Sequence, residues 1–354
     1  MANPYQQLPA RAFWRTAVGA RPMGQIADLW SPSFPIGKED SIATLGSCFA
    51  QHISRALVSK GYRWLNSEPA PPLFPEERKP DYHYDVFSAR VGNIYTVTLL
   101  KQWTYWAFDL AAPPSETWKI GDRFYDPFRP TIEPHGFATE LELTELRGQT
   151  LSALRGMFES CDVFIFTLGL TEAWVNRRSG VVYPMCPGVI AGEFSDEIHE
   201  FRNYDYTEVR SDLEDVIALI RTRNPGMKVV LTVSPVPLTA TASDDHVLVA
   251  TTYSKSTLRA VAGDVARSME GVDYFPSFEI ISSYPFKAAF YEPNLRSVTR
   301  DGVAFVMSRF FDKVGGAGEE EAGEANSAQA IAEANGDDYV DVVCEDIILE
   351  EMRR

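Results

Sequence analysis

Two adjacent residues with nucleophilic side chains, Ser47 and Cys48, follow a short apolar run that ends in glycine. Such a run, followed by the helical pattern of residues 49–61, predicts a strand, a tight turn and a helix. A thiolate at the first turn of a helix is stabilised by backbone amides, which would make Cys48 a usable nucleophile. The alternative interpretation is structural: Ser47 caps the helix, and Cys48 packs as a small apolar side chain.

The rest of the chain alternates strand-like and helix-like segments. Strands are predicted at residues 42–46, 62–65, 162–168, 229–236 and 272–275, and helices at residues 49–61, 86–110, 140–160, 206–223, 254–269 and 300–311. This alternation predicts an α/β fold of three layers, in which helices cover both faces of a parallel sheet of about five strands. Ligands of such sheets bind at the carboxyl edge, where the strand order reverses.

The composition divides the chain into three parts. Residues 1–38 are rich in aromatic residues and prolines and are predicted to form an arm packed on the domain of residues 39–314. Residues 315–354 form an acidic tail, whose glycine-rich first part is predicted to be mobile. The apolar residues near its end are predicted to dock on the domain or on a partner protein. Within the domain, the proline-broken loop of residues 118–134 is long enough to act as a lid.

Charge and cysteine content exclude several classes of protein. The chain has 354 residues and a net charge of -16, which argues against binding to nucleic acid. Four cysteines without a secretory pattern at the start do not resemble a disulfide framework, so a cytoplasmic setting is predicted. The cysteines also lack the paired spacing of zinc sites, and no metal is predicted. No apolar run approaches the roughly 20 residues that span a bilayer.

The sequence GSCFA at residues 46–50 resembles the signature of the GSCFA family, whose members are similar to SGNH (GDSL-type) esterases and acyltransferases. Further stretches fit this family: residues 92–93, TLGLTEAW at 167–174, LTVSPVP at 231–237, and residues 253–259 with 274–279. The resemblance extends over about residues 40–312. It implies a flavodoxin-like, SGNH hydrolase-like fold with lid-like loop insertions.

The resemblance also implies roles for individual residues. In SGNH enzymes the nucleophile follows Gly-Asp in a Gly-Asp-Ser turn, which favours Cys48 as the nucleophile, with Ser47 as the alternative. Glu172 would orient a histidine or act as a base. An acyl-transfer site also needs donors for the oxyanion of the tetrahedral intermediate. The predicted oxyanion and substrate-binding positions are Gly46, Gly92, Asn93, Gly169, Thr171, Lys255 and Arg296.

The general base departs from the family pattern. SGNH enzymes take it from an Asp-x-x-His motif, but residues 290–298 contain no histidine, and Arg296 stands near that position. His246 follows the fourth strand, where a neighbouring aspartate would orient its ring. His52 is the alternative base, because it lies four residues after Cys48 on the same helical face.

These residues predict an acyl-ester hydrolase or O-acyltransferase that works through an acyl-enzyme. The substrate would be a small-molecule or carbohydrate ester. No cofactor is predicted, although a transferase would take its acyl group from a coenzyme A thioester. The alternative is a catalytically degenerate SGNH-fold protein that binds a partner through its acidic tail.

Overall fold

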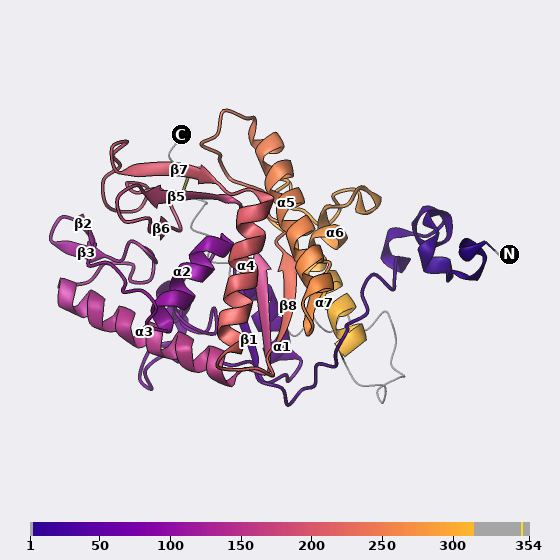
Figure 1. The fold of residues 1–354 in the computed structure, drawn as a ribbon, viewed down its shortest axis with the longest axis horizontal. Helices are drawn as coiled ribbons and strands as arrows, with labels where there is room; N and C mark the ends of the chain where they lie inside the picture. The colour runs from indigo at the N-terminus through magenta and orange to yellow at the C-terminus, as the bar shows by residue number, and fades with distance from the viewer. Residues whose placement is uncertain (1–2, 315–347, 350–354) are drawn as a thin grey trace.

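The centre of the molecule is a parallel sheet of four strands (Figure 1). The computed structural model describes residues 3–314 and 348–349. The strands, in the order β1-β4-β8-β9, are Ile42–Gly46, Val163–Leu168, Lys228–Val233 and Val272–Phe275. β1 and β4 are buried along their whole length, as expected of parallel strands with helices on both faces. The predicted α/β fold is confirmed.

The edge of the sheet beside β1 is shorter than predicted. The strand expected at residues 62–65 is a single parallel bridge between Ile42 and Trp64. Ile42 N donates to Arg63 O at 2.9 Å, and Leu65 N donates to Ile42 O at 2.8 Å. With this segment included, the strand order is the flavodoxin-like 2-1-3-4-5. The order therefore reverses between β1 and β4, whose carboxyl ends form the topological switch point.

Helices cover the two faces of the sheet. One face packs against α1, α6 and α7, formed by Ala50–Ser59, Ser277–Ser282 and Arg300–Val314. The other packs against α2, α3, α4 and α5, formed by Val97–Ala107, Glu140–Ser160, Tyr206–Arg221 and Val247–Ser268. Side chains alternate along the strands, so that Ile42 and Ile165 enter one core while Ala43 and Phe164 enter the other. The molecule thus has the three predicted layers.

The segment before α2 is not helical, although a helix was predicted over residues 86–110. Ser88 N donates to Thr44 O at 3.2 Å, and Ile94 N donates to Gly46 O at 2.9 Å. These contacts place residues 88–94 along β1. The helix begins only at Val97, after the Thr96 side chain accepts from a first-turn amide. The helix is therefore shorter than predicted. Many aromatic residues of this region pack in the core.

Two small antiparallel sheets were not predicted. β5, β6 and β7, formed by Glu172–Asn176, Val182–Tyr183 and His199–Asn203, lie in the order β6-β5-β7. Because β5 begins directly after β4, this sheet lies across the carboxyl end of the parallel sheet (Figure 1). β2 and β3, formed by Trp118–Ile120 and Arg123–Tyr125, make a hairpin inside the predicted loop of residues 118–134.

A buried ion cluster fixes the rest of that loop to α3. Asp126 Oδ2 accepts from Arg129 Nε at 2.9 Å, and Asp126 Oδ1 accepts from Arg147 Nη2 at 2.8 Å. Burial works against ionisation of Asp126, but the guanidinium groups of Arg147 and Arg129 hold its pKa below the usual range. Lifting the loop would separate Asp126 from Arg147 and leave the buried guanidinium group without this carboxylate, which is costly. The loop is thus an ordered insertion over α3.

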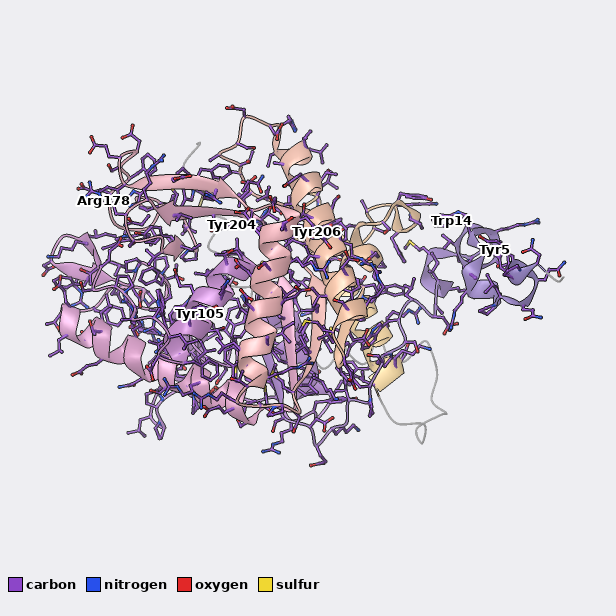
Figure 2. All side chains as sticks on the ribbon, viewed as in Figure 1. Tyr5, Trp14, Tyr105, Arg178, Tyr204 and Tyr206 are labelled. Carbon is purple, nitrogen blue, oxygen red and sulfur yellow. The ribbon has the colours of Figure 1, made fainter. Side chains whose placement is uncertain are left out.

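The N-terminal segment has two parts. Residues 3–25 form short, exposed turns that stand away from the sheet, where Trp14 stacks on Tyr284 at 5.7 Å between ring centroids (Figure 2). The segment then enters the core, where Trp30 packs against Phe275 and Phe310. Of the predicted acidic tail, residues 315–347 and 350–354 lie outside the described residues. Among the described helices, none has the length and hydropathy needed to cross a bilayer.

Candidate active site at the switch point

The turn after β1 requires glycine at position 46. Gly46 has a φ of +136°, and a Cβ there would lie 2.4 Å from Thr167 O. No other residue fits so close to a neighbouring backbone. Ser47 N then donates to Thr167 O at 3.0 Å, which binds the turn to the end of β4. The predicted turn therefore lies at the switch point between β1 and β4.

The two candidate nucleophiles are buried in this turn. Ser47 is 2% exposed and Cys48 is 5% exposed, and Cys48 is not in a disulfide. Within the part of the chain that the structure describes, the buried Ser47 Oγ makes no hydrogen bond. The alternative prediction, that Ser47 caps the helix, is wrong, because no side chain caps the N-terminus of α1. A buried hydroxyl without a partner is unusual in a folded protein and calls for an explanation.

Two of the predicted oxyanion segments pack against the turn. Ile94 N donates to Gly46 O, which places buried Asn93 and its neighbour Gly92 beside the turn. On the other side, a Cβ on Gly169 would lie 3.0 Å from the Ser47 Cβ. The structure therefore brings the segments at residues 46–47, 92–94 and 169 together.

The amides after β4 are already occupied. Gly169 N and Leu170 N both donate to Tyr95 O, at 3.1 and 2.8 Å. Thr171 N donates to Ser254 Oγ at 3.0 Å, and Thr171 Oγ1 donates to Asn203 Oδ1 at 2.7 Å. The role of Tyr95 was missed because a backbone carbonyl carries no sequence signal. At the start of α1, Ala50 N, Gln51 N and His52 N likewise donate to the carbonyls of residues 47, 48 and 49. Oxyanion donors would therefore have to come from groups of the turn itself or from contacts that change when substrate binds.

A largely apolar pocket opens beside the turn, with a volume of about 260 Å³. It lies between the β5–β7 sheet and residues 238–242, and its lining includes Leu170, Glu172, Trp174, Phe201 and Leu238. Ser47 and Cys48 do not line it. Leu170 does, and it directly follows Gly169, which packs on Ser47. Gly169 and Leu170, which are consecutive, therefore connect the turn to the pocket wall.

Glu172 supplies a carboxyl group to this pocket. Its Oε1 accepts from Thr241 Oγ1 at 2.8 Å. Burial raises the pKa of Glu172, an effect opposed by the bond from Thr241. Cys186 also lines the pocket, and burial raises the pKa of its thiol to about 11. Because the thiolate is the reactive form, Cys186 is a poor nucleophile near neutral pH.

His246 caps a helix. α5 begins at Val247 rather than at the predicted Ser254, and exposed His246 accepts from Leu248 N through Nδ1 at 3.2 Å. A backbone amide, not a neighbouring aspartate, thus orients the ring. Because Nδ1 accepts this bond, the proton of the neutral imidazole lies on Nε2.

His52, the alternative base, is buried on α1 with its ring edge-on to Phe49. Burial, and next the charge of Arg55, lowers the pKa of His52 to about 3. An imidazole with this pKa does not hold a proton near neutral pH, so His52 is a weak general base.

The two predicted substrate-binding cations are buried. Lys255 on α5 is 2% exposed, and its Nζ donates to Gly169 O at 2.7 Å. It therefore holds the backbone directly after β4. Arg296 is also buried, in the loop before α7, where its amide donates to Asn294 Oδ1 at 3.0 Å.

Comparisons with known proteins identify the family of the chain. No curated protein and no solved structure matches the chain significantly. A model of the GSCFA family matches residues 41–310. This range covers well over half of the chain and runs from β1, with the turn that follows it, into α7. The chain belongs to the GSCFA family.

Proposed function

We propose that this protein cleaves or transfers the acyl group of an ester through an acyl-enzyme on Cys48 or Ser47. The observation that supports it best is the glycine-dependent turn at the switch point, packed against two loops and next to an apolar pocket. Ligands of flavodoxin-like sheets bind at this place. The substrate class is a small-molecule or carbohydrate ester with an apolar acyl group.

The two candidate nucleophiles are supported by different observations. Cys48 lies two residues before α1, near the positive end of the helix dipole, which favours a thiolate. The Ser47 hydroxyl oxygen is buried and makes no hydrogen bond within the described residues, so that it could be used in a reaction. Either would attack the ester carbonyl and expel the alcohol, and water or an acceptor hydroxyl would then take the acyl group. In a transferase, the first leaving group would be the thiol of coenzyme A.

The oxyanion and proton-transfer roles fall to neighbouring groups. The amides near Cys48, Gly92 and Asn93 would hold the oxyanion. His246 would take and return the proton, and to do so its ring must give up the Leu248 amide so that a nitrogen lone pair is available. Glu172, which lines the pocket, would orient the histidine or act as a base.

A second candidate function is a binding protein on the same fold. It is favoured by the burial of Ser47 and Cys48 and by the engagement of His246 as a cap. In this case the pocket holds a ligand that is not turned over, and the acidic tail contacts a partner protein.

Ester hydrolysis by alanine variants tests the proposal. With p-nitrophenyl esters of increasing chain length, Ser47→Ala or Cys48→Ala is expected to lose about 10³-fold in kcat/KM, because removing the nucleophile removes the covalent path. Cys161→Ala is the matched control, because this buried thiol precedes β4 at the opposite end of the sheet. Wild-type turnover in both the Ser47 and the Cys48 variant would refute the catalytic assignment.

A further inference from the structure

We propose that residues 3–25, here called the N-terminal lobe, form the contact through which two copies of this chain associate. In this dimer the aromatic and cationic surface of each lobe packs on the acidic domain of the other copy. The inference does not depend on the proposed function, because it concerns association alone. It is supported by the exposure of the lobe, by its apolar surface and by its charge.

The N-terminal lobe is ordered by local backbone contacts but has no core of its own. Ala12 N donates to Pro9 O at 2.9 Å, and Ala20 N donates to Arg15 O at 2.8 Å. None of residues 3–25 is buried. Ordering a backbone costs conformational entropy, which folded segments offset by burying apolar side chains. A single chain does not provide this burial for the lobe, so a second molecule has to supply it.

The surface of the lobe is rich in large apolar side chains. Tyr5 is 67% exposed and Trp14 is 57% exposed, and both lie at the end of the molecule that stands away from the sheet (Figure 2). Tyr284 of the domain stacks on Trp14 and is itself 77% exposed, so it extends the same surface. The other large apolar side chains exposed on the lobe are Leu8, Phe13 and Met23. Exposed apolar surface of this kind marks an interaction site.

The charge of the lobe indicates which partner it fits. Residues 3–25 contain three basic residues, Arg11, Arg15 and Arg21, and no acidic residue. Residues 26–314 contain 37 acidic and 28 basic residues, so the domain carries a net negative charge. The lobe of one copy is therefore electrostatically complementary to the domain of another. An anionic bilayer fits less well, because it would attract the lobe but repel the domain.

Symmetry adds to this complementarity. In a dimer with a two-fold axis each copy contributes one lobe and receives the other, so that every favourable contact is made twice. Stable interfaces involve roughly 20–30 residues on each side, and a segment of the length of residues 3–25 is close to this size. A second copy thus supplies both the acidic surface and the apolar burial that the lobe lacks.

Sedimentation velocity of the full chain, at concentrations up to about 100 µM, tests the inference. The wild type is expected to form a dimer that dissociates on dilution. Trp14→Ser and Arg15→Glu should each raise the Kd of the dimer at least about tenfold, because the first removes an exposed ring and the second reverses a charge. Added salt should also raise this Kd, since it screens the attraction between lobe and domain.

Leu73→Ser and Arg178→Glu are the matched controls. Leu73 is 97% exposed, and Arg178 is exposed at the end of the molecule opposite the lobe (Figure 2). Each control makes the same kind of change outside the lobe and should leave the Kd of the dimer unchanged. All four substitutions are at exposed positions, and urea unfolding checks that the domain keeps its stability.

Three outcomes would overturn the inference: a wild type that stays monomeric at the highest concentration, a dimer whose Kd is the same in both lobe variants, or a dimer that the controls weaken as much as the lobe variants do. Flotation with phosphatidylglycerol vesicles distinguishes the other occupant. A monomeric chain that binds these vesicles, and loses this binding in Trp14→Ser, would assign the lobe to a lipid surface instead.

Discussion

Gly46 determines the backbone path into the candidate site. Its positive φ and its contact with the β4 backbone exclude a side chain, and the next residue is Ser47. The apolar run that ends in glycine was enough to predict this turn, because a strand end and a glycine are both local signals.

Gly46→Ala is expected to destabilise the protein by about 3 kcal/mol or more, since backbone strain adds to a clash that only backbone movement can relieve. Gly156→Ala is the matched control: it lies inside α3 with open space around its Cβ position, and should stabilise the helix by about 0.5–1 kcal/mol. Urea unfolding measures both. A loss below about 1 kcal/mol for Gly46→Ala would show that the turn tolerates a side chain.

Other residue contacts could not be predicted from the sequence. The resemblance to a known family, and not a local pattern, predicted Gly92, Asn93 and Gly169 near Ser47. The Tyr95 carbonyl, which occupies the Gly169 amide, acts through its backbone and leaves no pattern. The capping role of His246 depends on where α5 begins, and the first residue of a helix is difficult to predict from sequence.

At the scale of elements, α5 is tied to the end of β4 by Lys255. Its ammonium group bonds the Gly169 carbonyl, one residue after β4 ends at Leu168. This contact fixes the backbone that packs on Ser47. If the proposed function holds, we expect Lys255 to act by positioning this backbone and not by contacting substrate.

Lys255→Met is expected to cost about 1–3 kcal/mol, because it leaves the Gly169 carbonyl buried without this donor. It should also lower kcat for the best ester more than it changes KM, since the turn loses its support. Lys313→Met is the matched control; its exposed pair with Asp28 should contribute less than about 1 kcal/mol. Unfolding by urea and steady-state kinetics measure the two effects, and equal results for both lysines would contradict a positioning role.

The two antiparallel sheets were not predicted, for a physical reason. β7 has the sequence His-Glu-Phe-Arg-Asn and is only partly buried, so it has no apolar run. β6 has two residues, which is too short for any periodicity. The strands β1, β4 and β8 were predicted well because burial on both faces requires a nearly continuous apolar run, and β9 was predicted although Asp273 interrupts its apolar residues.

At the scale of the whole molecule, the strand order explains why distant segments meet. The chain leaves β1 toward one edge of the sheet and returns to form β4 on the other side of β1. The carboxyl ends of these two strands therefore lie next to each other, and the pocket under the β5–β7 sheet is connected to the turn through Gly169 and Leu170. Local patterns predicted the layers, whereas the pocket depends on inserted segments whose packing no local pattern encodes.

Capture of the acyl-enzyme would decide whether the turn after β1 carries the nucleophile. A Cys186→Ala background removes the thiol that lines the pocket, and the peptide masses distinguish a label on the turn from one on another cysteine. The protein is mixed with p-nitrophenyl octanoate, quenched in acid and digested, and the peptides are weighed. An octanoyl group is expected on Ser47 or Cys48, and it should disappear when that residue is replaced by alanine. Ester turnover without acylation of either residue would show that the nucleophile lies elsewhere.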